Sequence, residues 1–135
     1  MKSLLLTLLL ISSSAFAAGS FNCEQVDQSN KGAISIAAGT SHAVGNPLFT
    51  GLTVYYKDQV QGMINRDRIV GYWNEGKELK IQAVDEDALD VVLRIVVANI
   101  SENSDGIGTL NLNFKTPYGK TITRKNVKVR CFTGE

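Results

Sequence analysis

Period-two alternation of apolar and polar residues constrains the fold of this chain more than any other feature. Beyond residue 31, short alternating stretches are separated by turn-forming residues at a spacing of roughly 8–12 residues. Successive side chains of a strand point to opposite faces, so this pattern indicates half-buried strands. No segment has the period of an amphipathic helix. The sequence therefore predicts an all-β fold.

About eight antiparallel strands are expected, joined mainly by short turns. The predicted strands span residues 32–38, 50–57, 59–64, 68–73, 78–84, 89–98, 109–115 and 121–132. Such a succession is typical of a meander that closes as a small barrel or folds as a two-sheet sandwich. In the last predicted strand the apolar residues change parity between Ile122 and Val127, which predicts a β-bulge near residues 125–126.

The first 17 residues have the layout of a cleaved export signal. Lys2 is followed by an apolar run over residues 4–11 and by the small-residue site Ala15-Phe16-Ala17. The run is shorter than the ~20 residues that a membrane-spanning helix needs. We therefore expect a signal peptide at 1–17 and one mature domain at 18–135 that does not span a membrane. The short signal favours the periplasm or the medium of a Gram-negative bacterium.

Charge narrows the class of partner. Removing 17 of the 135 residues leaves 118 and, with Lys2 lost, 13 basic against 13 acidic residues. A neutral chain lacks the basic footprint of a nucleic-acid-binding protein. The expected partner is an extracytoplasmic protein or glycan, and the expected state is a monomer or weak dimer. The last predicted strand is locally basic, as an edge strand protected by lysines or a surface for an acidic partner would be.

The mature chain has two cysteines, Cys23 and Cys131, one near each end. Export exposes them to an oxidising environment, so we expect a disulfide that joins the terminal regions. On the chain-entropy model, closing a loop of this size contributes about 4–5 kcal/mol to stability. A catalytic thiol or a metal ligand is the alternative, but neither cysteine has a partner at a motif spacing. No metal and no cofactor are expected.

A catalytic interpretation would depend on His42, the only histidine, and on the acidic turn 85–87. Connections of a meander alternate between two ends, so the irregular segment 39–49 should share an end with turns 65–67, 85–88 and 116–119. The acidic turn opens like a calcium loop but lacks the later ligands and glycine, which favours an ordinary hairpin turn. No nucleophile elbow accompanies His42. We expect no catalysis, and a hydrolase is the least favoured of three functional hypotheses.

Two aromatic pairs, Tyr55-Tyr56 and Tyr72-Trp73, are more suggestive. Neighbouring residues of a strand face opposite sides, so each pair should place one ring in the core and one outside. Outward rings, together with Tyr118, would form a platform for a protein or a glycan. Alternatively, the second ring of each pair covers the sheet or lies under a loop. The candidate binding residues are Tyr55, Tyr72, Trp73, Tyr118 and His42.

Strand 89–98 is apolar on both faces, so the outward residues Val92 and Val96 should be covered by the N-terminal segment, by segment 39–49 or by another chain. The favoured function is that of an exported binding or structural-interaction module without catalysis. A lipocalin-like barrel that carries a small apolar ligand is the alternative. Its inward face would be lined by residues such as Leu93, Ile95, Leu110, Leu112 and Phe114.

Overall fold

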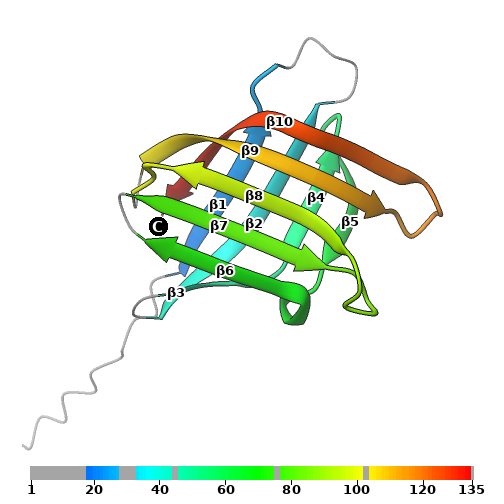
Figure 1. Cartoon of the computed structure of the whole chain (residues 1–135), viewed down its shortest axis with the longest axis horizontal. Coiled ribbons are helices and arrows are strands. Elements are labelled where there is room, and N and C mark those ends of the chain that lie inside the picture. The colour runs from blue at the N-terminus through cyan, green and yellow to red at the C-terminus, as the bar shows by residue number, and fades with distance from the viewer. Residues whose placement is uncertain (1–17, 28–32, 44–45, 75–76, 102–103, 135) are drawn as a thin grey trace, which may run out of the picture.

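The computed structural model in Figure 1 describes residues 18–27, 33–43, 46–74, 77–101 and 104–134, so the expected signal peptide at 1–17 lies outside the described residues. The all-β prediction is confirmed. The elements in chain order are β1 (Ala18–Gln25), β2 (Ile34–Ala43), β3 (Asn46–Phe49), β4 (Leu52–Tyr56), β5 (Gln59–Ile64), the 3-10 turn η1 (Arg66–Arg68), β6 (Ile69–Asn74), β7 (Glu78–Val84), β8 (Val91–Ala98), β9 (Ser104–Lys115) and β10 (Thr121–Gly134). No helix in the described part of the chain has the length and apolarity needed to cross a membrane.

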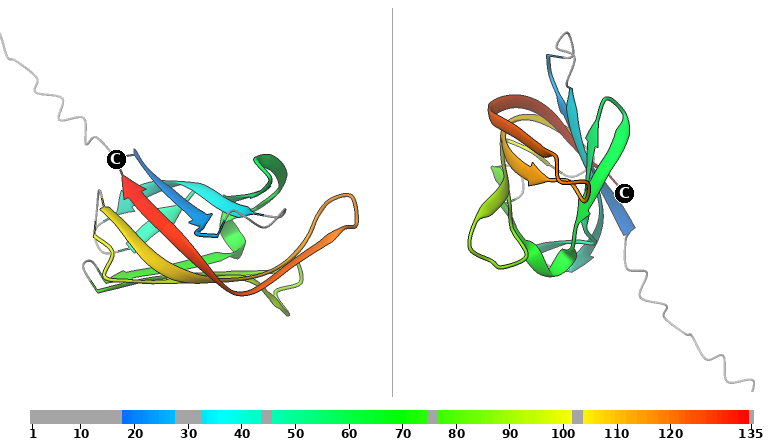
Figure 2. Two further views of the ribbon diagram at one scale, coloured as in Figure 1. Left: turned by 90° about the horizontal axis from the view of Figure 1, so that it is seen from above. Right: turned by 90° about the vertical axis from the view of Figure 1, so that its right-hand side faces the viewer.

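Nine of the strands form a nearly closed antiparallel barrel. Their order across the sheet is β5-β4-β2-β1-β10-β9-β8-β7-β6, and β3 pairs with β2 at the side of this path. The order is that of a meander whose first and last strands, β1 and β10, pair with each other. The seam lies between β5 and β6, which η1 connects but no ladder joins, and β3 lies against β6. Figure 2 shows the strands wrapped around a common interior.

The disulfide spans the pair of strands that closes the barrel. Cys23 of β1 stands directly opposite Cys131 of β10, and the two are bonded. The predicted disulfide is therefore confirmed. Strand β1 was not among the predicted strands, because Phe21 and Cys23 are its only large apolar residues. It is held instead by ladders on both sides, with β2 and with β10.

Apart from shifts of one or two residues, two other boundaries differ from the prediction. Segment 39–49, expected to be irregular, forms the end of β2 and all of β3. Strand β9 begins at Ser104 instead of residue 109. Gly106 and Gly108 lie in this early part of β9, and a Cβ on either would come within 2.8 Å of a Val97 methyl group. Glycine weakens the sequence signal of a strand, but here it allows the backbone to approach β8 closely.

The inward-facing residues make one hydrophobic core. The side chains that would line a ligand barrel, Leu93, Ile95, Leu110, Leu112 and Phe114, are all buried in it. The predicted bulge is confirmed by a register shift between Arg124 and Val127. At the bulge the backbone N–H of Asn126 donates to Oδ1 of Asn111 at 3.0 Å. The shift turns both Ile122 and Val129 toward the core despite their opposite parity.

The two ends of the barrel differ. One end is closed by the fully buried Ile100, next to Ser101, whose carbonyl oxygen accepts a hydrogen bond from Thr133 Oγ1 at 2.9 Å. The other end carries η1, the turn between β7 and β8, and the turn between β9 and β10. Its surface is hollowed, and this end is therefore the place to look for a site.

Candidate functional site

The β9–β10 hairpin leaves the barrel wall before it ends. Strands β8 and β9 are paired only as far as Leu93 opposite Leu112, whereas β9 and β10 stay paired out to Lys115 opposite Thr121. Residues 113–115 of β9 thus lie beyond the ladder with β8. The free part of the hairpin projects past the rest of the barrel (Figures 1 and 2). The divergence of the two strands opens a cleft between β8 and the hairpin.

Two adjoining pockets make up this cleft, and Val92 of β8 borders both. The inner pocket, of about 590 Å³, is lined by Met63, Ile64, Arg68, Asp85, Glu86, Asp87, Val92, Phe114, Lys115, Thr116 and Pro117. The outer pocket, of about 450 Å³, is lined by Val91, Val92, Arg94, Asn111, Leu112, Asn113, Thr123 and Lys125. The cleft therefore combines apolar surface with side chains of both charges.

The tip of the hairpin rests on β5. A Cβ at Gly62 would lie 2.8 Å from Cζ of Phe114 and 3.4 Å from Cδ of Pro117, so only glycine leaves room for this contact. The turn itself is held by Thr116, whose backbone N–H donates to the Lys120 carbonyl at 2.7 Å and whose Oγ1 accepts from the Lys120 N–H at 3.1 Å. Thr116 is buried. The tip is consequently packed against β5, and buried Thr116 anchors its turn.

One aromatic side chain stands at the apex of this fixed tip. Tyr118 is 95% exposed, next to Gly119, whose φ of 83° the turn requires. Met63 of β5, at the rim of the inner pocket, is 60% exposed. Tyr118 and Met63 thus leave large side chains exposed next to a cleft, where a binding partner would bury them.

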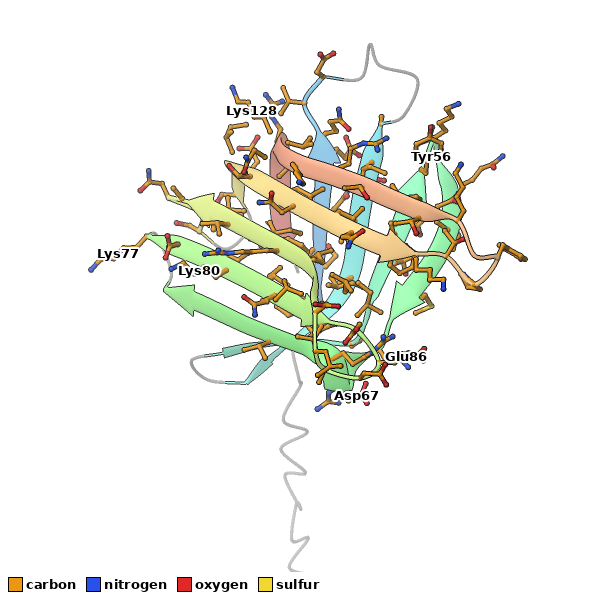
Figure 3. All side chains as sticks on the ribbon, turned by 45° about the vertical axis from the view of Figure 1, so that its right-hand side comes forward. Tyr56, Asp67, Lys77, Lys80, Glu86 and Lys128 are labelled. Carbon is orange, nitrogen blue, oxygen red and sulfur yellow. A yellow bond between two sulfur atoms is a disulfide. The ribbon has the colours of Figure 1, made fainter. Side chains whose placement is uncertain are left out.

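The acidic turn forms the opposite wall. Oδ1 of Asp85 accepts hydrogen bonds from the backbone N–H of Leu89 at 2.9 Å and of Asp90 at 3.4 Å, so this carboxylate holds the turn together. Glu86 and Asp87 are exposed and contribute negative charge to the cleft. Figure 3 shows Glu86 at the same end of the barrel as Asp67 of η1. Within the described ranges, no three His, Cys, Asp or Glu side chains are grouped so as to hold a metal ion.

The acidic turn also allows a test of backbone conformation. Ala88 is exposed and has a φ of 56°, which a Cβ disfavours. We expect Ala88→Gly to raise the free energy of unfolding by about 0.5–1 kcal/mol, because glycine adopts this conformation freely. Ala98, which is exposed in β8, is the matched control. Ala98→Gly should lower the free energy of unfolding by about 0.5–1 kcal/mol, because glycine weakens a strand. Urea unfolding measures both, and changes of the same sign would contradict the assigned turn.

The predicted binding residues are spread over several places. Tyr118 is at the tip, and Tyr55 is half-buried on β4. Tyr72 and Trp73 belong to β6, and His42 to β2, but the side chains of these three lie outside the described residues. Strand β4 pairs with β2 and β5, and β6 pairs with β7. Tyr55 and the β6 rings are therefore not on neighbouring strands.

Segment 39–49 and turns 65–67, 85–88 and 116–119 were expected to share one end of the barrel, and the three turns do. Residues from η1, from the acidic turn and from the hairpin tip line the inner pocket together. The β2–β3 hairpin, which carries His42, instead lies beside β6 and away from the acidic turn (Figure 1). Half-buried Val92, expected to be covered, borders the cleft. The roles of Phe114, Pro117 and Met63 were missed, since they depend on where β9 leaves β8.

Comparison of the chain with protein-family models, with curated proteins and with solved structures finds no match. Any assignment of function therefore rests on the chemistry and shape of this site.

Proposed function

We propose that the chain is an exported, non-catalytic binding module that recognises an extracytoplasmic partner protein through the β9–β10 tip and the cleft beside it. The observation that carries the proposal is the 95% exposure of Tyr118 at the apex of a tip that packs against β5. Tyrosine is among the residues that contribute most to protein interfaces. A fixed backbone reduces the entropy lost on binding.

The cleft adds shape and charge to this anchor. Its inner pocket of about 590 Å³ has the size of a site for a small ligand or for a few inserted side chains. Arg68 and Lys115 lie on its walls together with the acidic turn. A partner segment with an apolar residue flanked by charges of both signs would complement it, and complementary charge contributes specificity.

The core supports surface binding over a ligand held inside the barrel. The residues that would line a ligand cavity, including Leu93, Ile95 and Leu110, pack against one another as the core. The hydrolase hypothesis receives little support, because the Asp85 carboxylate is engaged in its own turn and the His42 hairpin lies elsewhere. The disulfide and the composition of residues 1–17 support export.

Site-specific photo-crosslinking in cells that export the protein tests the proposal. A photoreactive phenylalanine analogue is placed at position 118, at position 63, or, as a control, at exposed Lys80 of β7. We expect one protein adduct of defined mass from positions 118 and 63 and none from position 80. Tyr118→Ala should weaken binding of the identified partner at least tenfold while changing stability by less than about 0.5 kcal/mol.

Three results would argue against this function. Equal adducts from all three positions would indicate nonspecific contact. A carbohydrate adduct would assign a glycan in place of a protein. A small molecule that copurifies with the intact protein, seen by native mass spectrometry, would favour the ligand-carrying barrel.

A further inference from the structure

Three cationic side chains surround one aromatic ring beside the hairpin tip. The Nζ atoms of Lys120 and Lys57 lie 5.2 Å and 5.3 Å from the centroid of the Tyr56 ring, and Cζ of Arg124 lies 5.8 Å from it. All three distances are within the ~6 Å range of cation–π contacts. None of the three cations lines either pocket of the cleft. The cluster is thus a separate feature of the surface.

The backbone fixes where these cations originate. Lys57 occupies the two-residue turn between β4 and β5 with a φ of 51°, and its N–H donates to the Ala33 carbonyl at 3.1 Å. Lys120 ends the hairpin turn that buried Thr116 holds. Arg124 begins the bulge of β10, and its Nη1 donates to the Thr123 carbonyl at 2.8 Å. The cluster therefore results from the tertiary fold and not from one flexible segment.

The electrostatics of the cluster favour an anion. Three like charges around one ring repel one another, so an anion placed among them is stabilised. Tyr56 is half-buried against the core, so water screens these charges less on the ring side. A guanidinium and two ammonium groups together supply donors for several oxygens of one anion.

We propose that Lys57, Lys120, Arg124 and Tyr56 form a binding site for a phosphate group, carried either by a soluble phosphate or by an anionic lipid headgroup. The Arg124 guanidinium, whose Nη1 also donates to the Thr123 carbonyl, and the two ammonium groups each donate to oxygens of the phosphate. Lys120 lies in the turn of the hairpin tip, whereas Lys57 and Tyr56 belong to neither the tip nor the cleft, so the variant Lys57→Gln tests this site apart from the proposed recognition of a partner protein.

Binding of phosphate probes to matched variants tests the site. Lys57→Gln/Lys120→Gln removes two charges from the cluster, and Lys77→Gln/Lys80→Gln removes two from the far side of the barrel, as Figure 3 shows. The probes are inorganic phosphate and pyrophosphate, by calorimetry, and phosphatidylcholine vesicles with and without phosphatidylglycerol, by flotation. We expect the cluster variant to bind about 25-fold more weakly than wild type, about fivefold for each charge, and the control variant to bind like wild type.

The outcomes separate the sources and can overturn the proposal. Cluster-dependent binding of inorganic phosphate or pyrophosphate assigns a soluble ligand, and cluster-dependent binding only to phosphatidylglycerol vesicles assigns a lipid headgroup. Equal losses in the two double variants would show attraction by net charge alone and overturn the site. Absence of binding to every probe would overturn it as well. Thermal unfolding checks that both variants fold, and the single variant Lys57→Gln, with an expected fivefold loss, replaces the double variant if it does not.

Discussion

Replacing both cysteines by alanine is expected to lower the free energy of unfolding by about 4–5 kcal/mol. The disulfide joins residues 108 positions apart, and on the chain-entropy model a loop of about 100 residues gains this much from closure. At roughly 3–6 °C per kcal/mol for a domain of this size, the melting temperature should fall by about 15–25 °C. Calorimetry or circular dichroism of Cys23→Ala/Cys131→Ala measures both quantities.

Because the disulfide joins β1 to β10, its removal should loosen this region of the barrel first. Cys23 and Cys131 are directly opposite one another in the β1–β10 ladder, which is the pairing that closes the barrel. Amide exchange in β1 should therefore accelerate before exchange in the β8–β9 ladder does. Wild-type protein in reductant is the control, and it should match the double variant. If the double variant melts within a few degrees of the oxidised wild-type protein, the predicted contribution of the disulfide to stability is wrong.

Gly108→Ala is expected to destabilise the protein by about 2–4 kcal/mol, although it adds only one methyl group. Gly108 stands opposite Val97 in the ladder between β9 and β8. A Cβ at this position would overlap the carbonyl oxygen of Val96 and lie 2.8 Å from a methyl carbon of Val97. Backbone atoms in the middle of a paired strand have no room to move away, so the ladder must distort.

Gly39→Ala provides the matched control for this substitution. Its Cβ would lie 2.7 Å from Oγ1 of Thr50, an exposed hydroxyl that can rotate away at the loss of its 3.2 Å hydrogen bond to the Gly39 carbonyl. We expect a cost below about 1 kcal/mol, which is typical for a surface position. Urea unfolding of the two variants gives the comparison. If Gly108→Ala proves as stable as Gly39→Ala, β8 and β9 are not as close as the structure has them.

Several features of the fold could be predicted because they depend on residues that are close together in the sequence. The parity change between Ile122 and Val127 is visible in the sequence, and it marks the bulge. The meander order follows from short turns between alternating segments. Strands β1 and β3 and the start of β9 escaped prediction because pairing with neighbouring strands stabilises them, while their own sequence signals are weak. Strand β1 has few large apolar side chains, β3 is short and contains proline, and the start of β9 contains glycine.

The candidate site was predictable only in part. Tyr118 stands in a recognisable Pro117-Tyr118-Gly119 turn, so its exposure could be expected from the sequence. The contact of Phe114 and Pro117 with Gly62 could not be, because it joins residues about fifty positions apart across the barrel. The convergence of Lys57, Lys120 and Arg124 on Tyr56 could not be predicted either, because it also joins segments that are distant in the sequence.

By itself, the sequence determined the all-β class, the disulfide, the bulge and the inward faces of β7, β8 and β9, since each depends on side-chain alternation or on a count of cysteines. Only the tertiary structure decided that the barrel nearly closes through β1 and β10, that β9 leaves β8 after Leu112, and that a cleft and a cationic cluster flank the hairpin tip. These features depend on the curvature of the sheet and on contacts between distant segments, which the periodicity of a single chain does not encode.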